Sequence, residues 1–239
     1  MRQTRSITLT VLVLAATLLL VGAAQAANRS ADPVRRAVTR AIDSGAIDRA
    51  DGNRYLRVYR DSVQAAKRLA GQRRSELDYV IGTLRRIARA GKLNAGRAPP
   101  LFLILDRNRE WWQANGPPAS GARLHFGSSP VIFQYFPGLG LQLHPLANFS
   151  TVNALWSAHK DLQLRALVHD LLPLRVSRGG FKAWEYYFDF GGGSPPWISG
   201  MAQATAMQAL ARASIRLADP ELMQAAREAR GAFERRSST

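Results

Sequence analysis

The chain has 239 residues, a formal net charge of +16 at pH 7 and no cysteine. The absence of thiols excludes disulfides, thiolate metal sites and cysteine nucleophiles. A strongly basic chain suits a polyanionic partner, although a generally basic, solvated surface would explain the charge equally well.

The amino terminus has the layout of a secretory signal peptide. Arg2 and Arg5 precede a mostly apolar run from Ile7 to Val21, and the small-residue pattern Ala24-Gln25-Ala26 follows. The run is shorter than the roughly 18 to 20 apolar residues of a membrane span. We therefore expect residues 1–26 to be removed and the mature chain to be secreted or extracytoplasmic, without stable membrane insertion. An uncleaved anchor is the alternative. Export disfavours nucleic acid as a partner and favours an acidic polysaccharide or an anionic lipid.

Residues 27–96 are predicted to form an N-terminal helical region, and residues 97–239 the following domain. Between Asp32 and Asn94, apolar residues recur at helical spacing in three segments, and Gly91 is the expected stop of the third helix. Short turns between amphipathic helices favour antiparallel pairs. After a linker at 94–100, the stretch 101–130 alternates extended and turn signals.

Two later segments are dense in aromatic, amide and acidic side chains. The first is VIFQYFPGLGLQLHPLANFSTVNALW, residues 131–156, in which Ser150 is the expected cap of a helix. The second is WEYYFDFGGGSPPWISGMAQATAMQALARA, residues 184–213, in which Pro195-Pro196 is expected to open a helix. A final helix is expected at 220–233. Together these patterns predict a mainly all-α fold with short extended segments.

The second segment contains groups that can transfer protons. Phenols and carboxylates donate and accept protons, and a nearby arginine such as Arg178 can lower the pKa of a tyrosine. If the segment is extended, Glu185 and Tyr187 point one way, and Trp184 and Tyr186 point the other. The alternative is an amphipathic strand that packs its aromatic face into a core.

Rings beside amides are also what a sugar site needs, because rings cover the apolar faces of a pyranose while amides bond its hydroxyls. The candidate rings are Tyr135, Trp184, Tyr186 and Trp197, and the candidate amides are Gln134, Gln142, Asn148 and Gln203. The four histidines show no paired metal-ligand spacing, so no metal site is predicted. The triple glycine at 191–193 is not followed by Lys-Ser or Lys-Thr and is better explained as a tight turn than as a phosphate loop.

The second segment, together with IFQYFPGLGLQLHPLANF, resembles bacterial members of the D-glucuronyl C5-epimerase family. The most specific element is PW-x-S-x-MAQ, which begins at Pro196. The resemblance implies a partial α/α toroid of antiparallel helical hairpins around a polysaccharide cleft. It also implies inversion of carbon 5 of glucuronate residues within a polymer, giving iduronate, with no cofactor.

The predicted site residues follow from the resemblance and from the residue chemistry above. Tyr135, Glu185 and Tyr186 are the candidate catalytic residues. The candidate substrate-binding residues are Gln142, Asn148, Arg178, Trp184, Tyr187, Trp197 and Gln203. We expect Tyr135 and Tyr186 to face one concavity that holds a uronic acid ring.

The chain ends at AREARGAFERRSST, before the Glu-Tyr-Pro and Asn-Gly-Phe motifs that the family carries later. We therefore expect either a truncated or frame-disrupted product or a chain whose missing hairpins come from elsewhere. An incomplete ring would expose part of its inner core and favour self-association. Two alternatives stay open: a polysaccharide lyase, which forms the same intermediate and then expels the substituent at carbon 4, and a noncatalytic protein that binds acidic glycans. The polymer, its sulfation and the direction of epimerisation are not specified by these residues.

Overall fold

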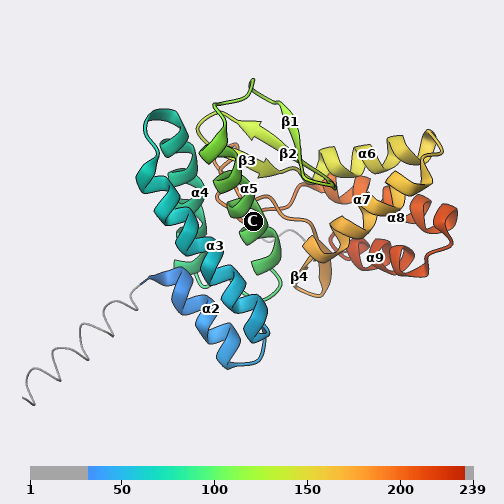
Figure 1. Cartoon of the computed structure of the whole chain (residues 1–239). Coiled ribbons are helices and arrows are strands. Elements are labelled where there is room, and N and C mark those ends of the chain that lie inside the picture. The colour runs from blue at the N-terminus through green and yellow to red at the C-terminus, as the bar shows by residue number, and fades with distance from the viewer. Residues whose placement is uncertain (1–31, 235–239) are drawn as a thin grey trace, which may run out of the picture.

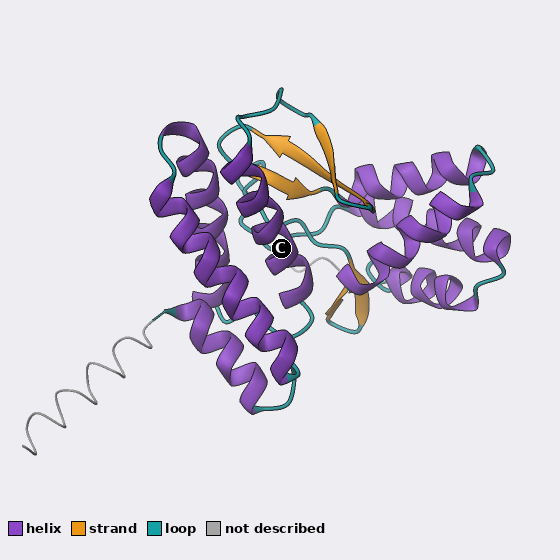
Figure 2. Ribbon diagram, viewed as in Figure 1, coloured by secondary structure: helices purple, strands orange, loops and turns teal. Residues whose placement is uncertain are grey.

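The computed structural model describes residues 32–234, and the expected signal peptide lies outside the described residues. This part of the chain is mainly helical, with eight α-helices and a few short antiparallel strands (Figures 1 and 2). Helices α2 to α5 gather on one side and α6 to α9 on the other, with a three-stranded sheet above and between them (Figure 1). The mainly α-helical prediction is confirmed, whereas the closed or partial ring of the toroid stays a prediction.

The first group begins with α2 (Pro33–Asp43), α3 (Arg49–Arg68) and α4 (Gly71–Arg89). These are the three helices expected between residues 32 and 94. Asp32 and Asp48 cap the first two, because their carboxylates accept hydrogen bonds from otherwise unpaired amides of the first turn. Helix α4 ends at Arg89, and Gly91 follows with φ +68°, so the predicted glycine stop is confirmed.

Helix α5 (Ala98–Ala114) corrects the expectation of extended and turn structure at this point. Pro99 lies in its first turn, where a missing amide hydrogen breaks no helical hydrogen bond. The apolar run that follows is buried against α3 and α4. This packing crosses the predicted domain boundary near residue 97, which stays a prediction.

The sheet has the order β1 (Arg123–Phe126), β2 (Ser129–Phe136), β3 (Gly140–Leu143), with antiparallel neighbours. Alternation along the strands gives it two different faces. One face packs against α5 and α7 and carries Phe133, Tyr135, Leu141 and Leu143. The other face carries Gln134, Phe136 and Gln142.

The second group pairs α6 (Pro145–Ser157) with α7 (Asp161–Leu171), and α8 (Gly200–Leu217) with α9 (Pro220–Arg230). Between the two pairs lie the 3-10 turn η1 (Leu172–Leu174) and a hairpin of β4 (Val176–Arg178) and β5 (Phe181–Ala183).

Two predicted helix starts are wrong. Helix α6 begins at Pro145 with His144 as its cap, so Ser150 lies inside the helix. Helix α8 begins at Gly200, after Pro195-Pro196, and Ser199 accepts the amide of Ala202 at 3.3 Å. In both places a side-chain acceptor next to the first free amides defines the start, as N-caps generally do. No helix between residues 32 and 234 has the length and apolarity to cross a membrane.

Candidate functional site

Three aromatic side chains form a stacked ladder beside the sheet. The ring of Tyr186 lies parallel to that of Trp197 at 4.3 Å, and Trp197 stacks on Phe190 at 5.6 Å. Backbone hydrogen bonds between Tyr186 and Trp197 fix the first pair, at 2.8 and 3.1 Å. The chain returns through a tight turn at Gly191 and Gly192, whose φ values of +57° and +82° favour glycine.

The outer end of this ladder is open to solvent. Phe190 is 65% exposed and Trp197 is partly exposed, whereas Tyr186 is buried. An exposed aromatic surface of this kind is available to the apolar face of a ligand.

The ladder adjoins the open face of the sheet through Phe136 and His144. Phe136 stacks on Phe188 at 4.9 Å and on the imidazole of His144 at 6.0 Å, and His144 meets the Tyr186 ring edge-on at 5.4 Å. The segment 184–199 and the β2–β3 hairpin are therefore brought together here, about fifty residues apart in the chain.

A buried amide on this face lacks one hydrogen bond. The side chain of Gln142 is 1% exposed, and its Nε2 donates to the carbonyl of Leu139 at 2.5 Å. Its Oε1 has no partner within residues 32–234. Buried polar atoms are nearly always bonded, so an ordered water would complete this group.

The imidazole of His144, which contacts Phe136 and Tyr186, is a neutral hydrogen-bond donor. Its Nδ1 accepts the amide of Ala147 at 3.1 Å as the cap of α6. Burial, followed by the charge of Arg123, lowers the pKa of His144, so the imidazole is neutral at neutral pH. With Nδ1 occupied as an acceptor, the proton sits on Nε2, and a neutral imidazole of this kind can stabilise a developing oxyanion.

We call Gln142, His144, Tyr186, Phe190 and Trp197 the hairpin site. Three of its members, Gln142, Tyr186 and Trp197, are among the predicted site residues. His144 and Phe190 are not. The His-Pro pair at the start of a helical pattern is the signal that could have identified His144.

Glu185 lies elsewhere, as a buried anchor. Its fully buried carboxylate accepts Arg97 Nε at 2.7 Å, Arg97 Nη2 at 2.8 Å and Arg178 Nη1 at 2.8 Å. Tyr187 also donates its hydroxyl to Glu185 Oε2, at 3.1 Å. Glu185 and Tyr187 therefore point the same way, as predicted, but that polar face is closed by arginines instead of open to a ligand. Burial, followed by the charge of Glu185, raises the pKa of Tyr187 well above its usual value.

Tyr135 lies on the packed face of the sheet. Its hydroxyl donates to Glu76 at 2.8 Å and accepts Gln72 Nε2 at 3.1 Å. Burial, followed by Glu76, raises the pKa of Tyr135 to about 12. The expectation that Tyr135 and Tyr186 face one concavity is wrong. Phe136, the strand neighbour of Tyr135, lies on the same side of the sheet as Tyr186, since both rings contact Phe188. Because side chains alternate along a strand, Tyr135 points to the opposite side.

Three further predicted residues bond to backbone carbonyls and amides inside the core. Asn148 Oδ1 accepts the amide of Ile132 at 2.8 Å, and Trp184 Nε1 donates to Leu171 at 2.8 Å. Gln203 Nε2 donates to Lys182 at 2.7 Å and Ala229 at 3.1 Å, which ties α8 to β5 and α9. In this arrangement all three side chains hold elements together.

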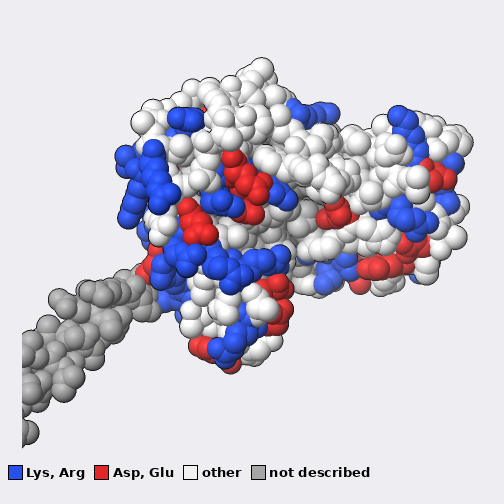
Figure 3. All heavy atoms as spheres, in the orientation of Figure 1, with Lys and Arg blue, Asp and Glu red and all other residues white. Residues whose placement is uncertain are grey.

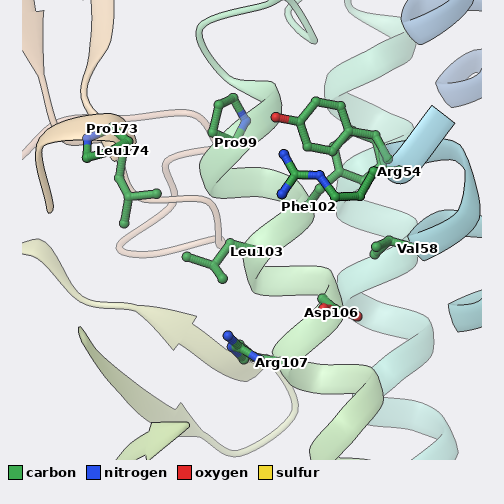
Figure 4. A pocket seen from close by; sticks show the side chains of 10 residues that line it. Arg54, Val58, Pro99, Phe102, Leu103, Asp106, Arg107, Pro173 and Leu174 are labelled. Carbon is green, nitrogen blue, oxygen red and sulfur yellow. The ribbon is translucent and has the colours of Figure 1, made fainter. Parts of the chain in front are cut away.

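A separate hollow of about 380 Å³ lies between α3, α5 and η1, where Pro173 and Leu174 face Leu103 of α5 (Figure 4). None of the predicted site residues lines it. Its two arginines are already paired, Arg54 with Asp51 at 2.6 Å and Arg107 with Glu110 at 2.7 Å. Between residues 32 and 234, no three acidic or histidine side chains gather closely enough to hold a metal ion.

Residues 178–239 match the family model described as D-glucuronyl C5-epimerase C-terminus. The resemblance to the C5-epimerase family is thereby confirmed over this segment. The C5-epimerase segment contains Tyr186, Phe190 and Trp197 of the hairpin site, and the match supports an epimerase-like function in general. Neither a curated protein nor a solved structure matches the chain.

Proposed function

We propose that the protein is a uronate epimerase, which inverts carbon 5 of glucuronate residues in an acidic polysaccharide outside the cytoplasmic membrane. The hairpin site is the proposed place of the uronate ring. The observation that carries the proposal is that the C5-epimerase segment supplies the aromatic ladder of this site.

The chemistry requires a base that takes the hydrogen on carbon 5 as a proton and an acid that returns a proton to the opposite face. The five hairpin-site residues supply the acid and the contacts to the developing charge, and the base is a group outside these five. The electron pair left by the first step moves into the adjacent carboxylate, so hydrogen-bond donors must stabilise the added charge. The neutral His144 offers its Nε2–H for this purpose. Trp197 and Phe190 would cover the apolar face of the sugar, and Gln142 Oε1 would contact one of its hydroxyls through an ordered water.

Tyr186 is the proposed proton donor. Burial raises the pKa of Tyr186, against the opposing effect of the Leu146 amide, which donates to the phenol oxygen at 3.2 Å. A phenol with a raised pKa stays protonated at neutral pH and can give its proton to a carbanion. Tyr135 and Glu185 enter the proposal as supports of the hairpin and of segment 184–190, because their polar atoms are bonded internally.

A second candidate is a noncatalytic protein that binds acidic glycans. The internal bonds of Tyr135 and Glu185 favour it, since they leave Tyr186 as the one predicted proton-handling residue at the hairpin site. This candidate keeps the same ladder and amide contacts to the sugar and lacks the inversion step.

The test is an exchange experiment with heparosan, a polymer of glucuronate and N-acetylglucosamine, in deuterated water. Deuterium at carbon 5, detected by mass spectrometry of the digested polymer, is the expected result. Binding of heparosan with no incorporated deuterium selects the noncatalytic candidate. An unsaturated uronate that absorbs in the ultraviolet selects a lyase and overturns the epimerase.

A further inference from the structure

A groove between α3 and α4 gathers three cationic side chains over an apolar floor. Lys67 comes from α3, and Arg74 and Arg85 come from α4. The groove has a volume of about 210 Å³, and its floor is Val63, Ala66 and Ile81. Lys and Arg side chains also gather over these helices on the surface shown in Figure 3. None of the hairpin-site residues lines the groove.

Arg85 is held in place by partners outside the groove. Its Nε donates to the hydroxyl of Tyr59 at 2.6 Å, and that hydroxyl donates to Asp32 Oδ2 at 2.6 Å. Within residues 32–234, the terminal Nη groups of Arg85 have no hydrogen-bond partner. A guanidinium fixed through Nε and free at both Nη groups is ready for a planar anion, because little side-chain freedom is left to lose.

The acidic residue in the lining does not neutralise the groove. Three cations and one acid, Asp78, leave two positive charges in the lining, and Asp32, whose Oδ2 lies 3.8 Å from Arg85 Nε, offsets one of them. Asp78 pairs with Arg74 at 3.3 Å, and both side chains are more than half exposed, at 52% and 56%. Exposed pairs contribute only about 0–1 kcal/mol, so a ligand anion can take the place of Asp78 beside Arg74.

We propose that the groove is a docking site for carboxylate groups of an acidic polysaccharide, remote from the ring that reacts. This inference rests on the proposed function, since it assigns the groove to another stretch of the same polymer. The Arg85 fork matches a carboxylate through two parallel N–H···O bonds, and Lys67 and Arg74 attract neighbouring charges. The floor of Val63, Ala66 and Ile81 accommodates the apolar face of a sugar ring.

The lining favours a polysaccharide over two other polyanions. No aromatic side chain lines the groove to stack a nucleobase, which single-stranded nucleic acids generally require. The large apolar side chains most exposed to solvent within residues 32–234, Leu162 and Ile215, belong to α7 and α8, so a membrane surface has no apolar contact at α3 and α4. A polymer with one carboxylate in every repeat can occupy the groove and the hairpin site together and so gain affinity.

The test measures heparosan binding to the full chain by titration calorimetry at low salt. The double variant Lys67→Ala/Arg74→Ala removes two exposed charges and is expected to leave the fold intact. It should bind about tenfold more weakly and with a shallower dependence on salt concentration. The matched control, Arg57→Ala/Arg227→Ala, removes two exposed arginines that lie outside the groove and should bind as the unaltered chain does. Arg85→Gln should weaken binding further.

Equal affinity of the groove variant and the control would overturn the inference. The inference would also be overturned if the groove variant lost affinity for anionic lipid vesicles and kept its affinity for heparosan. The deuterium exchange at saturating heparosan separates this result from the proposed function, because the groove variant should keep the exchange rate. If the groove variant binds heparosan more weakly but the unaltered chain incorporates no deuterium, the epimerase proposal fails and the docking site stands. If deuterium is incorporated but the groove variant binds as tightly as the unaltered chain, the docking site fails and the epimerase stands.

Discussion

The buried carboxylate of Glu185 offers the sharpest test of how the two groups of helices are joined. The substitution is Arg97→Met, which keeps the apolar stem of the side chain and removes its guanidinium. Arg97 stands at the start of α5, where it makes two of the four hydrogen bonds to Glu185. After the substitution, the fully buried carboxylate keeps only Arg178, which is 38% exposed, and the hydroxyl of Tyr187.

The size of the effect follows from the burial of this ion pair. The Arg97 and Glu185 side chains are 13% and 0% exposed, so solvent screens them little. Removing one partner of a buried pair generally costs about 3–5 kcal/mol, because the other charge stays desolvated, and here Glu185 would keep only Arg178 and Tyr187 as partners. For a chain of this size, each kcal/mol lowers the melting temperature by about 2–4 °C, which gives a decrease of about 6–20 °C.

The measurement is thermal and guanidinium unfolding followed by circular dichroism at pH 7. Arg74→Met is the matched control, since it breaks the exposed pair with Asp78 and should cost about 1 kcal/mol or less. The double variant Arg97→Met/Glu185→Gln should regain part of the loss, because the buried negative charge is removed together with its main partner. A decrease of less than about 1 kcal/mol for Arg97→Met would contradict this estimate, since a desolvated charge that loses its main partner should be destabilised by more than that.

Three further outcomes are expected. Gly140→Ala should lower the free energy of unfolding in urea by about 2–4 kcal/mol, because φ is +75° and the new Cβ would lie 2.6 Å from Asn108 Oδ1. An unchanged free energy of unfolding would contradict this close contact. Burial lowers the pKa of His144, so below about pH 6.5 the unfolded chain binds a proton that the folded chain does not, and the free energy of unfolding should fall. The measurement is the urea midpoint as a function of pH. His144→Asn, which keeps a capping acceptor, should flatten this dependence. Tyr186→Phe should slow deuterium exchange about 100-fold. Tyr135→Phe should lower the free energy of unfolding by about 1 kcal/mol and leave the exchange rate unchanged. Slow exchange in Tyr135→Phe and normal exchange in Tyr186→Phe would assign the catalytic role to Tyr135.

Features that depend on neighbouring residues along the chain could be predicted without the fold. The spacing of apolar residues predicted the three helices between residues 32 and 94. Gly91 marked the end of the third helix, because the chain leaves it with a positive φ that glycine tolerates best. Gly191 and Gly192 formed the predicted tight turn for the same reason. The PW-x-S-x-MAQ pattern identified the C5-epimerase segment because it is contiguous.

Which face of each strand is covered by the core, and which partner each polar group has, depends on how elements far apart in the chain pack together. Strand alternation places Glu185 with Tyr187 and separates Tyr135 from Phe136, but it does not say which side carries the core. Glu185 found Arg97 at a separation of 88 residues, and Tyr135 found Glu76 at a separation of 59. Such partners meet only when helices and strands pack, because hydrogen bonds and charges act over a few ångströms of space irrespective of distance along the chain.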